Sequence, residues 1–155
     1  MRGLSLTGPL FIARRRPFRF IVKRFTETSK WNDPWFSDLP ARFKLLWIFI
    51  CDHCDQSGVW TVNHRLAEFQ LGEKFTIPDA LLAFNGRVEV ISNGSKWWIK
   101  KFVLFQYGKL SKECKPHMPV FECLSRHGIS LEEVSQNEIF SNKVDNCKAY
   151  SRKFF

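Results

Sequence analysis

The sequence lacks several features that would place it in a common functional class. No stretch approaches the roughly 18–20 consecutive apolar residues that a transmembrane helix needs. Neither a Gly-x-Ser-x-Gly nucleophile elbow nor a glycine-rich phosphate loop occurs, and no pair of carboxylates shares a predicted helical face with a histidine. We therefore expect neither a membrane protein nor an enzyme, and no cofactor, which leaves a protein that acts by binding.

Cysteine is present in an odd number, five, and gives no disulfide framework. A 155-residue chain with 45% hydrophobic residues can build a core without disulfide staples, so we expect reduced thiols in a cytoplasmic protein. Cys51-x-x-Cys54 and Cys114-x-x-His117 have the internal spacing of zinc ligands. Because Cys51 and Cys54 end an apolar predicted helix, where thiols serve as small core residues, we predict no metal site.

Acidic residues are scarce at the start of the chain. Residues 1–30 contain eight Lys and Arg and one Glu, whereas residues 31–155 contain 16 bases and 14 acids, so most of the net charge of +9 lies in this arm. A basic arm favours polyanions such as nucleic acid, although a solvated tail is an equally good interpretation. Arg14, Arg15 and Arg16 are its candidate DNA-binding residues, of the kind that enters a minor groove.

Periodicity after residue 31 predicts three helices and a short strand. Apolar residues at positions 39, 43, 46, 47 and 50 lie on one helical face, with Pro40 in the first turn. Residues 59–62 are β-branched and aromatic, which favours a strand. Asn63 and Thr76 then suit the N-caps of helices over residues 64–71 and 76–84, and Gly72 suits a C-cap. Asp79, three residues after Thr76, predicts a capping box.

The clearest hairpin pattern follows these helices. Residues 87–92 alternate, Asn93-Gly94 is a strong turn signal, and residues 96–100 form the return strand. The order helix, strand, helix, helix, hairpin is that of a winged helix. We therefore predict a mainly α fold with a small β-hairpin, a winged helix-turn-helix with a C-terminal helical extension. Its predicted divisions are an arm over residues 1–30, a winged-helix domain over 31–107, an extension over 108–129 and a tail over 130–155.

The hairpin, or wing, carries the main candidate DNA contacts. Four basic residues lie on or beside it and could neutralise phosphates, namely Arg87, Lys96, Lys100 and Lys101. Trp98 shares a strand face with Lys96 and Lys100, where an exposed indole could stack on an unpaired base. The alternative is that Trp97 and Trp98 both pack, one on each side of a covered hairpin.

The helix-turn-helix is poorly equipped to read a DNA sequence. Its second helix, residues 76–84, contains one acid and no base, whereas a helix in the major groove needs Arg, Lys, Asn or Gln. On the preceding helix, His64 and Arg65 could contact phosphates or base edges, although a solvated helix face is at least as plausible.

Six segments resemble a known family. They are residues 23–36 (KRFTETSKWNDPWF), 40–47 (PARFKLLW), 54–60 (CDQSGVW), 102–108 (FVLFQYG), 115–117 (KPH) and 124–129 (LSRHGI). Together they resemble phage and prophage replication proteins of the DnaD-like type, which carry an N-terminal winged helix and act in helicase loading or replisome organisation. The resemblance covers about residues 22–129, so residues 1–21 lie outside it and translation could begin near Val22.

The resemblance and the wing together predict a non-enzymatic DNA-binding protein of phage or prophage replication. It would contact the phosphate backbone of double- or single-stranded DNA through the wing and recruit a helicase or helicase loader. One alternative is a winged-helix transcriptional regulator. Another is a protein-docking module without DNA affinity, in which the run over residues 102–107 and a helix over 116–127 could form a homodimer seam.

Overall fold

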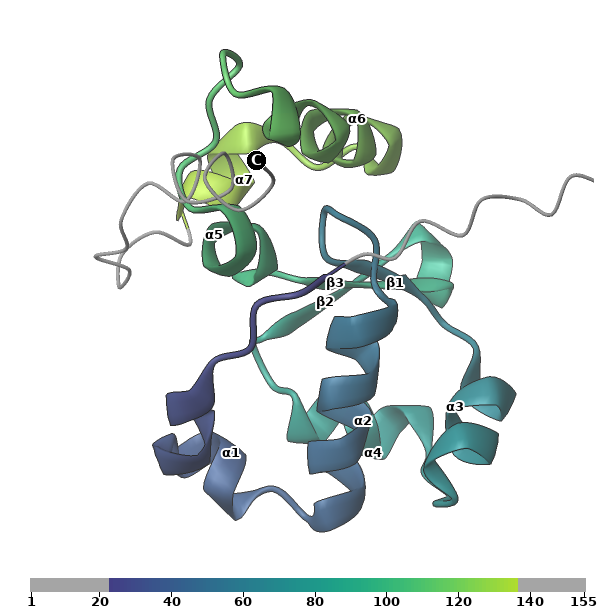
Figure 1. Ribbon diagram of the computed structural model, residues 1–155. Coiled ribbons are helices and arrows are strands. Elements are labelled where there is room, and N and C mark those ends of the chain that lie inside the picture. The colour runs from purple at the N-terminus through teal and green to yellow at the C-terminus, as the bar shows by residue number, and fades with distance from the viewer. Residues whose placement is uncertain (1–22, 137–155) are drawn as a thin grey trace, which may run out of the picture.

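The structure is a computed structural model that describes residues 23–136. Helix α2 (Ala41–His53) forms its centre (Figure 1). Phe43, Leu46 and Ile50 follow one another at spacings of three and four residues, and all three are buried. The predicted apolar helix face is therefore confirmed. Before α2 lie a 3-10 helix (Thr28–Asn32) and the short α1 (Pro34–Asp38), which begins where the Asp33 carboxylate accepts a hydrogen bond from the Trp35 amide.

Helices α3 (His64–Leu71) and α4 (Ile77–Ala83) begin and end where local chemistry predicts. The Asn63 side chain accepts a hydrogen bond from the Leu66 amide, and Gly72 ends α3 in the left-handed conformation. Thr76 Oγ1 accepts from the Asp79 amide, which is one half of the predicted capping box.

The sheet has three antiparallel strands, β1 (Val59–Thr61), β2 (Val88–Ile91) and β3 (Lys96–Ile99), in the order β1-β3-β2. Strand β3 is central, and its Trp97 lies opposite Trp60 on one side and Val90 on the other. The predicted hairpin is confirmed. Its loop covers residues 92–95, longer than Asn93-Gly94 alone, because the ladder ends at the Ile91–Lys96 pair.

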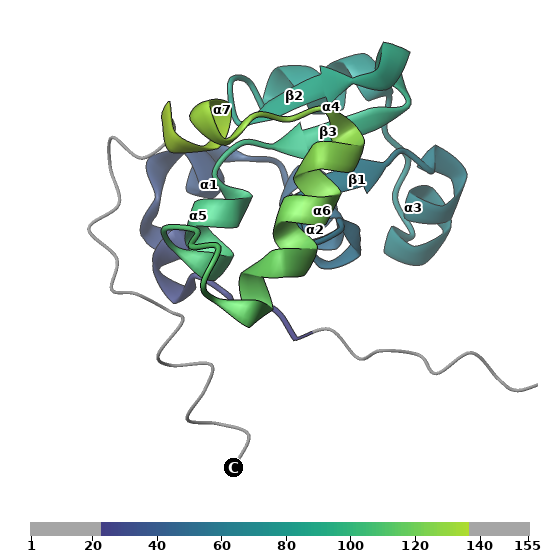
Figure 2. The ribbon, with the colours of Figure 1, turned by 90° about the horizontal axis from the view of Figure 1, so that it is seen from above.

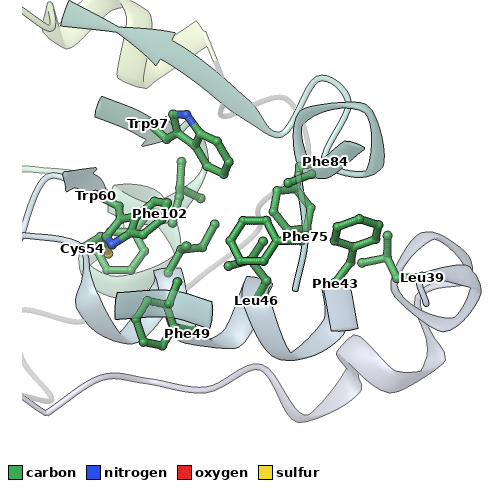
Figure 3. Packing of buried hydrophobic residues seen from close by; sticks show 14 of the residues in the cluster. Leu39, Phe43, Leu46, Phe49, Cys54, Trp60, Phe75, Phe84, Trp97 and Phe102 are labelled. Carbon is green, nitrogen blue, oxygen red and sulfur yellow. The ribbon is translucent and has the colours of Figure 1, made fainter. Parts of the chain in front are cut away.

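Helices cover both faces of this sheet. Figure 1 shows α1–α4 on one side and α5 (Phe102–Tyr107), α6 (Met118–His127) and α7 (Leu131–Gln136) on the other, and Figure 2 shows α6 crossing above β3. Two hydrophobic cores result. The larger one joins α2, α3, α4 and the Trp97 face of the sheet (Figure 3). The smaller one joins the opposite sheet face to α5, α6 and α7.

The C-terminal layer extends the predicted helical region. The apolar run over residues 102–107 is helix α5, and a 3-10 helix (Lys115–His117) precedes α6. Weak helical periodicity near residues 131–134 corresponds to α7, whose Val134 is buried in the smaller core. A mainly helical protein with a small antiparallel sheet is thus confirmed. Within residues 23–136, no helix combines the length and apolarity that crossing a membrane requires.

Candidate nucleic-acid interface

The two hairpin tryptophans are both buried. Trp97 is 0% exposed in the larger core, and Trp98 is 3% exposed in the smaller one. Trp98 Nε1 donates a hydrogen bond to the Ser57 carbonyl at 3.2 Å, so its one polar atom is also used inside the protein. The expectation that Trp98 is exposed for stacking on DNA is therefore wrong, because α5, α6 and α7 cover its face of the sheet.

Lys96, the first residue of β3, and Lys100, the residue after its end, both contact other parts of the chain. Lys96 Nζ lies 3.4 Å from His127 Nδ1, and His127 Nε2 lies 2.6 Å from Asp55 Oδ2. Lys100 Nζ lies 3.4 Å from a Glu89 carboxylate oxygen. Lys96 and Lys100 are four residues apart, about 13 Å at the rise of a strand. The hairpin therefore does not present these lysines together as the predicted DNA contacts, because they are separated and each lies beside a partner within the protein.

The remaining predicted wing bases, Arg87 and Lys101, lie near Lys100, at the end of the sheet where Val88 pairs with Ile99. The Arg87 guanidinium lies 3.9 Å from the ring centroid of Trp35, and its Nη2 is 3.4 Å from an Asp33 carboxylate oxygen. This stacking and ion pair fix Arg87 against α1. Lys101 follows β3, is exposed, and lines a groove between α2 and the start of the described chain.

Helices α3 and α4 present an apolar surface rather than a basic one. Phe69 is 85% exposed and Leu82 is 78% exposed, and α4 contains no base. Arg65 is exposed, whereas His64 Nε2 donates to the Phe75 carbonyl at 2.6 Å. His64 thus ties α3 to the following loop. The other predicted DNA contacts, Arg14, Arg15 and Arg16, lie outside the described residues.

A groove of about 500 Å³ lies between the first described residues and the core, and we call it the aromatic groove. Its apolar lining includes Trp35, Trp47, Ile48 and Phe102. Trp35 and Trp47 meet edge to face with ring centroids 5.1 Å apart, and Trp35 Nε1 donates to the Ala83 carbonyl. The walls are therefore held rigidly by the core, and the volume is in the range of small-ligand sites.

Residues 23–31, which we call the N-terminal segment, form one wall of the aromatic groove. The Gln106 side chain holds this segment as a neighbouring strand would: its Oε1 accepts from the Phe25 amide at 2.9 Å, and its Nε2 donates to the Phe25 carbonyl at 2.8 Å. Arg24 Nη2 donates to the Cys54 carbonyl at 2.7 Å. The structure therefore positions this segment, which the sequence offered only as part of an arm.

The N-terminal segment contains three bases, one acid (Glu27) and two aromatic residues. Lys23 is exposed, Phe25 is 44% exposed and Trp31 is 57% exposed. Lys30 is half-buried on the groove wall, with Nζ 6.0 Å from the ring centroid of Phe36. Basic side chains beside exposed rings are the combination that binds nucleic acid through phosphates and bases.

A second basic element is the lysine loop, residues 108–115, between α5 and the 3-10 helix. Lys109, Lys112 and Lys115 are all exposed. The loop is closed by the buried His117, whose Nδ1 accepts from the Ser111 amide at 3.0 Å. Tyr107 connects the loop to the N-terminal segment, because its ring packs on His117 and its hydroxyl lies 3.5 Å from Arg24 Nη1.

The cysteines with the spacing of zinc ligands are in different chemical states. Cys51, Cys54 and Cys123 are free thiols, whereas Cys114 is disulfide-bonded, so the expectation of reduced thiols is wrong for Cys114. Burial raises the pKa of Cys51 to about 12 and raises that of Cys54 further, which disfavours the thiolate that binds metal. Within residues 23–136, no three His, Cys, Asp or Glu side chains gather as a metal site.

Comparison with known protein families, with curated proteins and with solved structures finds no match for this chain. The family resemblance and the function it implies therefore stay predictions, and the local chemistry of the N-terminal segment, the aromatic groove and the lysine loop is the basis for a functional proposal.

Proposed function

We propose that this chain is a non-enzymatic, nucleic-acid-binding protein of phage or prophage DNA replication in the cytoplasm. The replication setting comes from the family resemblance, and the compartment comes from the odd cysteine count. The element order α2, β1, α3, α4, β2, β3 supports a winged helix, with α5–α7 as an added layer.

The observation that carries this proposal is the basic and aromatic N-terminal segment beside the aromatic groove. It places Lys23, Phe25, Lys30 and Trp31 along one exposed stretch, and residues 1–22 add five arginines and no acid. Elsewhere in the described chain the charge is balanced, because residues 32–136 contain 12 bases and 12 acids. We therefore place the phosphate contacts on the N-terminal segment and the lysine loop rather than on the wing.

This surface favours binding without much sequence reading. In the helix-turn-helix arrangement α4 takes the position of the recognition helix, and it offers Asp79 and the exposed Leu82 with no base. A transcriptional regulator would need base-edge donors at that position. The base-free helix therefore supports the replication proposal over the regulator.

A second candidate function, a protein-docking module, is favoured by the exposed apolar residues of α3 and α4. Phe69 and Leu82 are far more exposed than large apolar side chains usually are, and such exposure is typical of protein contacts. On the first proposal this face receives the helicase or helicase loader. On the second it is the chain's sole binding surface. Of the predicted dimer seam, Val103 of α5 and Leu124 of α6 are buried against the sheet instead.

Salt-dependent binding of a random-sequence oligonucleotide, measured by fluorescence anisotropy, tests the proposal. Each phosphate contact removed should lower the slope of log K against log salt by about 0.7 for a single strand and 0.9 for a duplex. The triple variant Lys109→Gln, Lys112→Gln, Lys115→Gln should therefore lower the slope by about 2–3. The control Lys100→Gln, on the hairpin, should leave it unchanged.

Absence of binding at about 100 mM salt would contradict the proposal, because even non-specific DNA binders reach about 10⁻⁴–10⁻⁶ M under such conditions. The docking module would then be the better account. A slope that responds to Lys100→Gln but not to the triple variant would return the contact to the wing.

A further inference from the structure

We infer that the aromatic groove holds one unpaired base of a single strand, so that the protein prefers single-stranded to duplex nucleic acid. The inference rests on the proposed nucleic-acid binding and adds the class of substrate. It uses a different part of the surface from the phosphate contacts of the lysine loop.

The shape and lining of the groove suit a flat aromatic ligand. A cavity of about 500 Å³ admits a single base with room for its sugar, and its lining combines Trp35, Trp47 and Phe25 with the aliphatic Ile48. The Phe25 ring is accessible from solvent, since 44% of the residue is exposed. Every base has a π face, so aromatic walls bind bases with little regard to sequence.

The polar groups of the groove match the rest of a nucleotide. Lys30 and Lys101 line it as cations within reach of a backbone that passes along the N-terminal segment, and the acids Glu27 and Asp33 also line it. Asp33 is paired with Arg87. Asp52 also lines the groove and is exposed, so its carboxylate can accept hydrogen bonds from the amino group of a base. The backbone of Phe25 is already held by Gln106, so this wall is formed before any ligand binds.

Only an unpaired base can use this groove. A base in a duplex is stacked between its neighbours, and entering a pocket would require it to be extruded at a cost of a few kcal/mol. A single strand has no such cost. An apolar peptide segment is the rival occupant, but it gives no role to Lys30 and Lys101, the cations that line the groove.

The test compares a labelled oligothymidylate with a hairpin duplex of equal charge, using the full chain at one salt concentration. Ile48→Trp fills the groove without changing charge, and Phe25→Ala removes the exposed ring while leaving the Gln106 hydrogen bonds to the backbone. Each should weaken single-strand binding roughly 5- to 150-fold, the range seen for losing one stacked base, with little effect on the duplex. Quenching of tryptophan fluorescence by the oligothymidylate should fall in parallel.

Two controls keep the result specific. Leu45→Trp adds the same side chain to an exposed position of α2 that does not line the groove, and it should bind as the parent does. Phe25→Tyr keeps an aromatic ring and should retain most of the affinity that Phe25→Ala loses. Circular dichroism of each variant shows whether it folds, and Phe25→Ala remains informative if Ile48→Trp does not.

The outcomes separate the inference from the proposed function. Equal binding of the two nucleic acids, unchanged by either groove variant, overturns the inference and leaves the proposed function intact. Binding of neither nucleic acid overturns both and assigns the groove to a peptide. A single-strand preference that both groove variants abolish and Phe25→Tyr retains supports the inference.

Discussion

Replacing Trp98 by alanine should unfold the protein more readily rather than weaken its hold on nucleic acid. Trp98 is 3% exposed and packs in the smaller core with Val59, Val103 and Leu124. Removing so large a buried side chain typically costs about 3–5 kcal/mol of the free energy of unfolding. Because a domain of this size has roughly 5–15 kcal/mol in total, the variant should remain folded but be clearly destabilised.

The matched variant Trp98→Phe separates packing from hydrogen bonding. It keeps an aromatic ring but leaves the Ser57 carbonyl without the indole donor now 3.2 Å away. A buried polar group without its partner costs about 1–3 kcal/mol, so Trp98→Phe should fall between the parent and Trp98→Ala. Trp31→Ala, at an exposed aromatic position, should cost less than about 1.5 kcal/mol, the upper range of its edge-to-face contact with Phe36.

Urea unfolding followed by circular dichroism gives these free energies, and anisotropy on the folded variants gives binding. The reasoning would be refuted if Trp98→Ala changed the free energy of unfolding by less than about 1 kcal/mol and abolished nucleic-acid binding. That pair of results would mean that Trp98 is exposed on a free wing.

Three further predictions concern the stability of the fold. Gly58→Ala should lower the free energy of unfolding, measured in urea, by roughly 2–4 kcal/mol, because Gly58 has φ of +81° and an added Cβ would lie 2.6 Å from Phe102 Cβ. A variant as stable as the parent would contradict this packing. His127→Ala removes the partner of Asp55 Oδ2 and should lower the free energy of unfolding by about 1.5–3 kcal/mol, with faster amide hydrogen exchange in α6. Unchanged exchange in α6 would show that this contact does not hold the C-terminal layer. Burial raises the pKa of Cys51 from about 9 to about 12, so the thiol loses its proton at lower pH in the unfolded chain than in the folded one. The free energy of unfolding should therefore decline as pH rises from about 9 towards 12. Urea midpoints that stay constant from pH 8 to 10.5 in the parent, or that fall equally in Cys51→Ala, would argue against this effect.

Local chemistry accounts for the elements that the sequence predicts well. The caps at Asn63 and Thr76 need only a neighbouring amide, so their effect is visible in a few residues. The apolar face of α2 is likewise predicted by the spacing of apolar residues within that helix. Such features are independent of what packs against them.

The covering of the hairpin could not be seen in the same way. Lys96, Trp98 and Lys100 alternate as on a solvated strand face. Of the helices that cover Trp98, α6 begins some 20 residues later at Met118, and α7 begins later still. The role of Gln106 was also missed, because no local sequence pattern marks a side chain that hydrogen-bonds a backbone as a neighbouring strand would. Its one signal was a polar residue inside the apolar run FVLFQYG, which a core helix would not otherwise bury.

The position of the nucleic-acid contact is tested most directly by titrating the ¹⁵N-labelled full chain with an oligothymidylate and following its amide resonances. The account predicts that the resonances of residues 23–31 and of Cys51 and Asp52 shift together, while those of residues 92–95 stay in place. Shifts confined to residues 92–98, with no shift in the N-terminal segment, would contradict it.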